Sequence, residues 1–566
     1  MLPRLQKRWK IRERIPAETD QALSTYPAFF RQILFSRGVI DEPSARAYLD
    51  GQVDRDDPYL LTDMQTSVDR LFWAIDHQES VAVYGDYDVD GVTATVLLTQ
   101  VLRQYGAQVT PYIPNRFDEG YGLNIEALEA LAAEGIRVVV TVDCGIRSPR
   151  EAVRAAELEI DLIISDHHHP DDEIPDAWSV ICPKRPEDQY PYKDLAGVGL
   201  AYKIARAMEL RRPDAGVRAE DWLDLVALGT VADVVPLHGE NRVLVRRGLE
   251  RMRSSSRPGL ISLANVARIK LSEVSAGDIG YTLGPRLNAA GRLDTARDAL
   301  RLLMTEDIME AGKLAQQLDN QNRQRQEMTR QMQEQAVLLA QSTGPQEMLL
   351  AFSNEFNSGV VGLAASRLVD TFYRPAVVGE VGAETTRASC RSIPEFHITS
   401  ALDECKDLLE RHGGHALAAG FTVRNEHLPE LRERLQTIAL RDLTGLDLRP
   451  VLYADLEIPL GDLHPDFLRH LDKLQPTGQD NPEANFVSRN LQVVRYKPVG
   501  TEGQHLRLTV SDGRITYDGI AFRQGHLAKA MPERVDIMFA YERNEFNGRV
   551  SLQLNIRDIK GAGIPD

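Results

Sequence analysis

The chain has 566 residues, of which 43% are hydrophobic and 26% charged, and its formal net charge is -17. This length is too great for one hydrophobic core, so about three or four domains are expected, and the composition excludes fibrous and wholly disordered proteins. The negative charge argues against adhesion to nucleic acid over the whole surface, yet residues 486–566 carry 12 Lys and Arg against 9 Asp and Glu, which allows a local basic groove.

Two classes of protein are excluded by the sequence pattern. No segment approaches the roughly 18 consecutive apolar residues of a membrane helix, so a cytoplasmic protein is expected. The four cysteines are scattered and include no Cys-x-x-Cys pair, so neither a disulfide framework nor a zinc knuckle is expected.

From residue 81 to residue 166, continuous apolar segments alternate with amphipathic segments. The pattern predicts strands at 81–85, 109–113, 137–143 and 161–166, and helices at 92–105, 124–135 and 149–158. Apolar strands between amphipathic helices indicate a parallel sheet that is covered on both faces. Ligands of such sheets bind beyond the carboxyl ends of the strands.

Acidic and histidine side chains stand at those strand ends. They are Asp86, Asp88 and Asp90 in YGDYDVDG, then Asp143, then Asp166, His167, His168 and His169, and finally Asp233 after a later helix-like segment. The first group begins like a calcium-binding EF-hand loop, but its twelfth position is Leu97 and the preceding segment is strand-like, so an EF-hand is excluded.

A subset of these residues has the composition of a site for two divalent cations. Asp88, Asp90, Asp143, His167, His168 and Asp233 offer four carboxylates and two imidazoles. Two cations about 3.5 to 4 Å apart stabilise the attacking and leaving oxygens of a phosphoryl displacement, so hydrolysis of a phosphodiester or phosphoanhydride is predicted. We expect Asp143 to bridge the cations, because its strand should be central, Asp86 to orient a ligand or water, and His169 to lie outside the site.

The rest of the chain indicates further domains. Residues 307–341 lack proline and are rich in Gln, Arg and Glu, which predicts one long connecting helix, with a coiled-coil dimer as the alternative. A second α/β pattern follows from residue 347. From about residue 451, period-two segments with a DG turn predict a small OB-type barrel. Its Tyr496 and Phe522 lie amid basic residues, as in proteins that bind single-stranded nucleic acid, or else fill the barrel core.

Several motifs resemble those of a known superfamily. YGDYDVDG, VTVDCGI, SDHHHP and GTVADVVPL resemble, in order, four motifs of the DHH phosphoesterases, and HGGHALAAGF resembles the glycine-rich motif of the associated DHHA1 domain. GPRLNAAGRL, RASCRSI and LQPTGQDNPEANF resemble segments of the RecJ family of single-strand-specific 5′ to 3′ DNA exonucleases. The resemblance runs from about residue 50 to residue 560.

The resemblance implies roles for individual residues. The metal ligands would be Asp88, Asp90, Asp143, His167 and Asp233, with Asp86 and His168 also catalytic. Substrate-binding residues would be Arg116, Arg286, Ser389, Arg391, Gly413, Gly414 and His415. Many relatives have a histidine where this chain has Tyr84, which leaves one metal with one nitrogen ligand fewer.

The resemblance also implies the domain order. We expect an N-terminal segment over 1–49, a DHH catalytic domain over 50–305, a connecting helix over 306–342, a DHHA1 domain over 343–447 and an OB-fold domain over 448–566.

The leading interpretation is a metal-dependent exonuclease of single-stranded DNA that uses two Mn²⁺ or Mg²⁺ ions and releases 5′-mononucleotides in DNA repair and recombination. We expect a monomer, with single-strand-binding protein and a RecQ-type helicase as partners and no membrane. A DHH phosphodiesterase of cyclic dinucleotides or short RNA is one alternative, although the barrel counts against a small substrate. A non-catalytic replication scaffold is another, although every metal position is an intact Asp or His.

Overall fold

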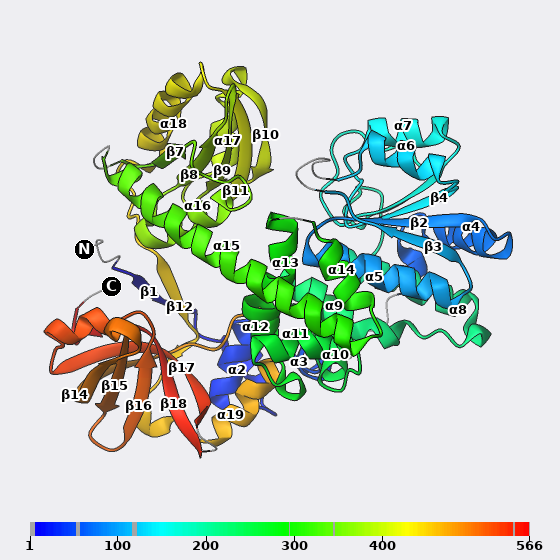
Figure 1. Cartoon of the computed structure of the whole chain (residues 1–566). Helices are drawn as coiled ribbons and strands as arrows, with labels where there is room; N and C mark the ends of the chain where they lie inside the picture. Colours follow the sequence, from blue (N-terminus) through cyan, green and yellow to red (C-terminus); the bar gives the residue numbers. More distant parts are fainter. Residues whose placement is uncertain are drawn as a thin grey trace. The chain divides into compact units, whose positions relative to one another are not determined.

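The computed structural model describes residues 6–51, 57–115, 122–293, 295–342, 346–546 and 549–564. The chain forms two compact units (Figure 1). The larger unit comprises Glu13–Asn322 and Asp455–Ile559, and the smaller unit comprises Met1–Arg12, Arg323–Ala454 and Lys560–Asp566. Within the described residues, no helix has the length and apolar character needed to span a membrane.

A parallel sheet is the framework of the larger unit, as the sequence predicts. Its strands, in spatial order, are β3 (Gln108–Tyr112), β2 (Ser80–Gly85), β4 (Val138–Val142), β5 (Asp161–Ser165) and β6 (Ser179–Ile181). The short strand β6 was not predicted. β4 lies at the centre, as expected for the strand that ends at Asp143.

Helices cover both faces of this sheet (Figure 1). On one face lie α5 (Val89–Gln104) and α8 (Gly197–Arg211), and on the other lie α6 (Ile125–Ala133) and α7 (Pro149–Glu157). The strands are buried from both sides, which explains why their sequences are continuously apolar rather than alternating.

Helix α5 begins three residues before the predicted start at Val92. Asp88 is its N-cap, and its Oδ1 accepts hydrogen bonds from the backbone N–H of Asp90, at 2.9 Å, and of Gly91, at 3.1 Å. The cap satisfies helix donors that would otherwise be unpaired. Asp90 therefore belongs to the first helical turn, and its side chain projects from a fixed position.

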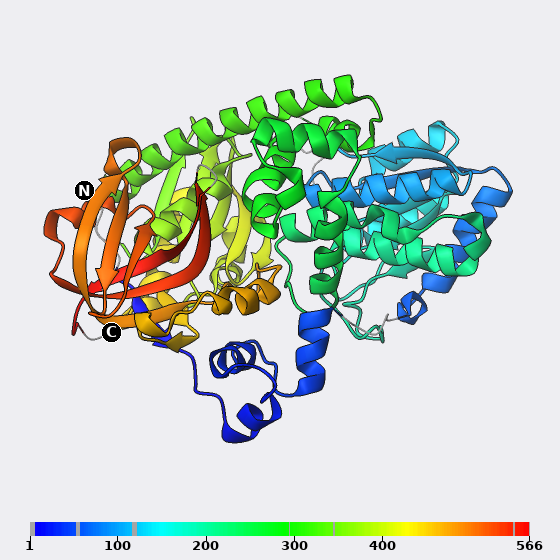
Figure 2. The same ribbon diagram turned by 90° about the horizontal axis from the view of Figure 1, so that it is seen from below.

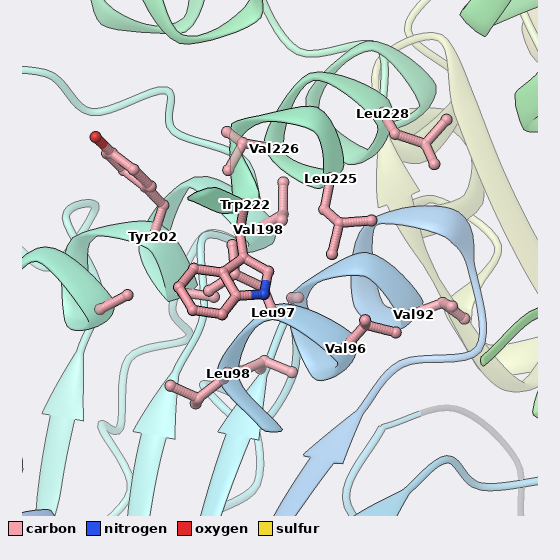
Figure 3. Packing of buried hydrophobic residues seen from close by; sticks show 14 of the residues in the cluster. Val92, Val96, Leu97, Leu98, Val198, Tyr202, Trp222, Leu225, Val226 and Leu228 are labelled. Atoms are coloured by element: carbon pink, nitrogen blue, oxygen red, sulfur yellow. The ribbon is translucent and has the colours of Figure 1, made fainter. Parts of the chain in front are cut away.

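Helix α9 and the residue before it complete the core over α5. Trp222 precedes α9 (Leu223–Ala232), and its indole lies among Leu97, Leu98 and Val198 (Figure 3). The indole Nε1 donates to Gln100 Oε1 at 2.8 Å, so this large ring is buried with its polar atom paired. This packing fixes α9, whose C-cap is Asp233.

The remaining helices of the larger unit surround these layers. They are α1 (Ala17–Ala22), α2 (Ala28–Phe35), α3 (Glu42–Asp50), α4 (Met64–Asp76), α10 (Gly239–Arg253), α11 (Pro258–Ala267), α12 (Ala276–Asp278), a π-helical turn (Ile279–Leu283), α13 (Gly284–Leu293), α14 (Arg297–Met304) and α19 (Asp466–Leu471). The predicted long helix is α15 (Ile308–Ser342), one continuous helix that passes from the larger unit into the smaller.

The barrel closes on itself, which confirms the predicted OB-type fold (Figure 2). Its strands follow the order β14 (Phe486–Val499), β15 (His505–Ser511), β16 (Thr516–Ala521), β18 (Arg549–Gly561) and β17 (Arg534–Phe546), and β17 pairs again with β14. The short β13 (Leu456–Glu457) joins β14. Tyr496 is 44% exposed and Phe522 53% exposed, so these aromatic side chains do not fill the barrel core.

The smaller unit is built on a mixed sheet. Its strands, in spatial order, are β10 (Leu409–His415), β11 (Ala418–Arg424), β9 (Thr385–Arg391), β8 (Ala376–Val381) and β7 (Leu349–Ser353). Helix α16 (Val361–Phe372) packs on one face, and α17 (Ile398–Asp403) and α18 (Leu428–Leu443) pack on the other. A separate pair joins β1 (Arg8–Ile11) to β12 (Val451–Ala454) in parallel.

The core under α9 should carry much of the stability of the larger unit. We expect Leu225→Ala, at a fully buried position, to lower the free energy of unfolding by about 2 to 5 kcal/mol because it leaves a cavity. Leu210→Ala, at a position 46% exposed in α8, is the matched control and should change it by less than about 0.5 kcal/mol. Urea denaturation measures both. Equal losses would mean that the packing in Figure 3 does not dominate the stability.

Candidate metal centre

Seven side chains from four segments converge at the carboxyl edge of the parallel sheet. Three groups have ligand atoms within 4.8 Å of one another. The groups are Asp86, Asp88 and Asp143; Asp143, His167 and His168; and Asp90, His167 and Asp233. The structure thus brings together all seven residues that the sequence proposed as catalytic, and Asp143 belongs to two of the groups.

His167 lies at the middle of this cluster. Its Nε2 is 3.0 Å from Asp143 Oδ1, 3.6 Å from Asp233 Oδ2 and 3.9 Å from Asp90 Oδ2. All these residues are buried except Asp233, whose side chain is 21% exposed. The side chains nearest His167 are therefore enclosed except at Asp233, whereas Asp88 and His168, at the rim of the cluster, are partly exposed.

Several atoms of the cluster lack a hydrogen-bond partner within the described part of the chain. They include Asp143 Oδ1, Asp233 Oδ2 and His167 Nε2, each with almost no contact with solvent, and the 3.0 Å separation between His167 Nε2 and Asp143 Oδ1 is not a hydrogen bond. Buried polar atoms without partners are costly, and carboxylate oxygens with imidazole nitrogens are the ligands that Mn²⁺ and Mg²⁺ sites use. The residues present fit the predicted pair of divalent cations.

Asp90 is fixed by the N-terminus of a helix. Its Oδ2 accepts from the backbone N–H of Gly197 at 2.6 Å, and its Oδ1 accepts from that of Val198 at 2.8 Å, both in the first turn of α8. A helix N-terminus favours a carboxylate. Even so, burial and the charge of Asp88 raise the pKa of Asp90 to about 7.

In the absence of cations, burial and the close approach of other aspartates also favour the protonated forms of the remaining carboxylate ligands. Burial, followed by the charges of neighbouring aspartates, raises the pKa of Asp143 and that of Asp233 well above 3.8. Burial lowers the pKa of His167 to about 3, so its imidazole is neutral and can act as a ligand. Like charges held this closely need a cation before all of them can ionise at neutral pH.

Asp166, for which the sequence predicted no role, positions His168. Asp166 Oδ1 lies 2.7 Å from His168 Nδ1 and accepts from the backbone N–H of His168 at 3.1 Å, while Oδ2 accepts from Ile146 N–H at 3.0 Å. Burial opposes a charged imidazole, but the hydrogen bond and charge of Asp166 outweigh it and raise the pKa of His168. In the sequence DHHH, an Asp two residues before a His is a pattern from which this contact between Asp166 and His168 could have been predicted.

Two glycines allow the site to be this compact, and neither was predicted. A Cβ on Gly197 would lie 2.6 Å from Cβ of Asp143, and a Cβ on Gly229 would lie 2.9 Å from Oδ1 of Asp90. Both separations are closer than side chains tolerate, so only glycine fits beside these carboxylates. Asp143 itself has φ 64°, a strained backbone conformation of the kind found at functional sites.

The motif GPRLNAAGRL supports the loop that carries Asp88. It forms α13, and Asn288 Oδ1 accepts from the backbone N–H of Val89 at 3.1 Å. Gly291 lies against the carbonyl of Tyr87, which a Cβ would approach to 2.7 Å. Arg286 from the same helix donates to Asp319 Oδ1 at 2.9 Å and to the carbonyl of Thr282 at 2.8 Å.

Tyr84 and His169 differ from the ligands in their placement. The Tyr84 hydroxyl donates to the carbonyl of Gly122 at 3.0 Å and accepts from Asn124 Nδ2 at 2.9 Å, which joins β2 to the start of α6. His169 is exposed, and its carbonyl accepts from Arg147 Nε, so it lies outside the cluster as expected.

Four of the five predicted substrate residues of the smaller unit share one face of its sheet. Across neighbouring strands, Ser389 pairs with Gly420 and Gly420 with Gly413, while Arg391 pairs with Ala418 and Ala418 with His415. Paired residues project to the same side, so Ser389, Arg391, Gly413 and His415 face the same way. A Cβ on Gly414 would lie 2.4 Å from the carbonyl of Ala418, so only glycine fits there.

The N-terminus of α16 lies on this same face. A Cβ on Gly362, in the first turn, would be 3.1 Å from Arg391 Nη2 and 3.4 Å from Ser389 Oγ. Gly362 was not predicted, because the residues around it in the sequence give no signal for its contact with β9. The remaining predicted substrate residue, Arg116, lies outside the described residues.

Comparisons with known proteins agree with this architecture. Three family models match in the expected order: the DHH family, N-terminal domain over residues 80–230, the DHHA1 domain over 346–440 and the RecJ OB domain over 454–558. The single-stranded-DNA-specific exonuclease RecJ of Bacillus subtilis is 38% identical over 97% of this chain and 70% of its own length. The chain belongs to the RecJ family.

Other members of the RecJ family match over most of the chain. RecJ of Escherichia coli is 33% identical over 97% of this chain and 99% of its own length. The crystal structure of RecJ in complex with Mn²⁺ from Thermus thermophilus has a TM-score of 0.85 and 29% identity, covering 99% of this chain and 80% of that chain. A Mg²⁺ complex of the same protein matches with a TM-score of 0.78.

Cations should stabilise this RecJ-family protein more strongly at higher pH. Unfolded aspartates ionise near pH 3.8, whereas Asp90 in the metal-free fold retains its proton to about pH 7. The folded form therefore binds more protons than the unfolded form in this window, and its stability falls as pH rises. We expect Mn²⁺ to raise the melting temperature more at pH 8 than at pH 6.

Thermal unfolding with and without Mn²⁺ at the two pH values measures this difference. Asp143→Asn is the control, because it removes one of the crowded charges and one ligand, and both the shift and its pH dependence should shrink. Equal Mn²⁺ shifts at pH 6 and pH 8 in the unmodified protein would show that the carboxylates are not strained by mutual repulsion.

Proposed function

We propose that this chain is a metal-dependent exodeoxyribonuclease that degrades single-stranded DNA in the 5′ to 3′ direction and releases 5′-mononucleotides, in DNA repair and recombination. The observation that carries the proposal is the cluster around His167, whose Nε2 lies within 3.9 Å of the carboxylates of Asp90, Asp143 and Asp233, in a chain of the RecJ family. We also infer the domain boundaries expected from the sequence, which are 1–49, 50–305, 306–342, 343–447 and 448–566.

The ligands of two cations, Mn²⁺ or Mg²⁺, would be Asp88, Asp90, Asp143, His167 and Asp233. When bound, the cations supply positive charge that stabilises the attacking and leaving oxygens of the phosphodiester. Asp143 is the candidate bridging ligand, because it is shared by two of the three groups and ends the central strand. Asp88 uses one oxygen as a helix cap, which leaves the other for a cation.

His168 and Asp86 would act on the substrate and the nucleophile. Asp166 keeps a proton on His168 Nδ1 and raises the pKa of the imidazole, which favours contact between His168 and the anionic scissile phosphate. Asp86 lies with Asp88 and Asp143 and is placed to orient a ligand or a water molecule.

Recognition of the 5′ end is assigned to the face that carries Ser389 and Arg391. A hydroxyl, a guanidinium and the adjacent first turn of α16 offer donors suited to a terminal phosphate. Gly413, Gly414 and His415 would let the backbone approach the strand, and Arg116 and Arg286 would contact its phosphates. The ion pair of Arg286 with Asp319 fixes its guanidinium beside α13.

The barrel would bind the part of the strand that extends away from the metals. Tyr496 and Phe522 are exposed among Arg495, Lys497 and Arg523, which suits stacking and phosphate contact. We propose further that the protein acts in the cytoplasm as a monomer, with single-strand-binding protein and a RecQ-type helicase as partners. The barrel disfavours a cyclic dinucleotide substrate, and the complete ligand set disfavours a scaffold.

Removal of the bridging ligand should abolish hydrolysis and preserve the fold. We expect Asp143→Ala to leave no detectable release of nucleotides from single-stranded DNA, because the site loses the carboxylate shared by two groups. Asp86→Asn should reduce the rate about 10- to 100-fold, less than Asp88→Asn, if Asp86 only orients a ligand. Release of nucleotides with Mn²⁺ measures the rates, and circular dichroism checks the fold.

Asp171→Ala is the control for that series, since Asp171 is an exposed acid that pairs with Arg147 near the same sheet edge. It should retain wild-type activity. Near-normal turnover by Asp143→Ala would contradict the two-metal mechanism, and equal losses in Asp86→Asn and Asp88→Asn would reject the separate role of Asp86.

Arg391 should select strands that carry a 5′-phosphate. Its Nη1 donates to the carbonyl of Cys390, whereas Glu395, the nearby acid that could have paired with Arg391 instead, accepts from the hydroxyl of Tyr373. We expect Arg391→Ala to lower the ratio of rates on 5′-phosphorylated and 5′-hydroxyl strands at least about tenfold, because a charge-assisted contact is lost. Arg387→Ala, on an exposed position of the same strand β9, is the control. A ratio unchanged by Arg391→Ala means that Arg391 does not read the end.

A further inference from the structure

One arginine of the larger unit joins three segments that are far apart in the sequence. Arg242 lies on α10 and is 2% exposed. Its Nη1 donates to the carbonyls of Leu474 and Pro476, its Nη2 to those of Lys473 and Gln475, and its Nε to that of Tyr48. One guanidinium thus binds four successive carbonyls in the segment that leads into the barrel.

Tyr48 completes the contact from the N-terminal segment. The Arg242 guanidinium lies over the Tyr48 ring, 4.1 Å from its centroid, and the Tyr48 hydroxyl donates to Asn481 Oδ1 at 2.7 Å. Asn481 Nδ2 in turn donates to the carbonyls of Leu474 and Pro476. The loop 473–481, part of the motif LQPTGQDNPEANF, is therefore bound by α10 on one side and by α3 on the other.

The same loop reaches the edge of the metal centre. Leu237 N–H donates to the carbonyl of Gln479 at 2.8 Å, and Leu237 follows Asp233 by four residues. The loop also lines a groove of about 750 Å³ together with Val234, the residue after Asp233, and with Tyr281, which is 89% exposed. A shift of the loop would therefore change the surface directly beside a predicted metal ligand.

The N-terminal helices extend this junction to the barrel. Side chains of α2, including Phe30, Ile33 and Leu34, pack in one cluster with barrel residues such as Phe486 and Phe539. Arg37 forms a buried ion pair with Asp455 at 3.0 Å and donates to the carbonyl of Pro482. The barrel, the N-terminal segment and the loop 473–481 are thus bound to one another and, through Arg242, to the catalytic domain.

We propose that Arg242 is a positioning residue that fixes the barrel on the catalytic domain. The distance between the strand-binding surface of the barrel and the metal centre then stays constant while a strand is bound at both. This inference rests on the proposed function. It assigns a role to the LQPTGQDN motif, whose carbonyls Arg242 binds. A fixed distance lets binding at the barrel and at the metals reinforce each other, whereas a substrate too short to reach the barrel gains nothing from it.

Arg242→Met removes all five donors and keeps an unbranched side chain as far as the position of Nε. We expect kcat/KM on a long 5′-phosphorylated oligonucleotide to fall about tenfold or more through KM, with kcat/KM on a 5′-phosphorylated dinucleotide within about twofold of wild type. Arg251→Met is the matched control, because Arg251 lies on the same helix and its guanidinium donates to the carbonyl and the carboxylate of the neighbouring Asp221 in a half-exposed ion pair. It should change neither value.

A distance measurement tests the junction without activity. The four cysteines are buried, so spin labels can be placed selectively on Glu157→Cys in α7 and Arg514→Cys in the barrel, both at exposed positions. We expect the distribution of distances between the labels to broaden in Arg242→Met and to stay narrow in Arg251→Met.

Each outcome distinguishes this inference from the proposed function. Wild-type protein that degrades neither substrate contradicts the proposed function, while the label distances still test the junction. Equal losses on long and short substrates, or distances and rates that match wild type, overturn the role of Arg242. If Arg242→Met does not fold, Arg242→Lys gives the test, since its point charge cannot reach all the carbonyls and about a threefold rise in KM on the long strand is expected. An unchanged ratio between long and short substrates in that variant overturns the proposal.

Discussion

Mutual repulsion among buried carboxylates is the constraint on which the larger unit depends. Asp90, Asp143 and Asp233 lie around one imidazole with little access to water, and burial raises the pKa of each. Such a cluster is tolerable only if its geometry is imposed by the surrounding core and its charge is offset by cations. The close packing of α5, α8 and α9 on the parallel sheet supplies the first condition, and divalent metals supply the second.

The same residues of α8 pack against the sheet and position the metal ligands. The first turn of α8 both covers the sheet and donates to Asp90, and its Gly197 leaves room for Asp143. A change that adds one methyl group at Gly197 would therefore disturb a ligand directly. The strained φ of Asp143 is maintained in the same way, because the central strand leaves its end little freedom.

The sequence predicted those features that depend on local periodicity. The strands that end at Gly85, Val142 and Ser165 follow from apolar runs, and a parallel sheet necessarily gathers their ends at one edge. Because Asp88 caps the helix, α5 begins at Val89 rather than at the predicted Val92. Hydrophobic periodicity alone does not reveal such a cap. The contacts of Gly197, Gly362 and Arg242 join segments distant in the chain, and one sequence contains no signal for them. The resemblance to a family, rather than spacing, suggested Ser389 and Arg391.

The charge of the site also determines how readily a phosphodiester can approach it. The chain carries a net charge of -17, and four carboxylates among the proposed ligands add a concentrated negative field at the place where a phosphodiester must bind. Four ionised carboxylates without cations would repel the strand, whereas two divalent cations would offset their charge. Cations held by these ligands would therefore let a phosphodiester approach the cluster, while basic residues on the barrel would attract the rest of the strand.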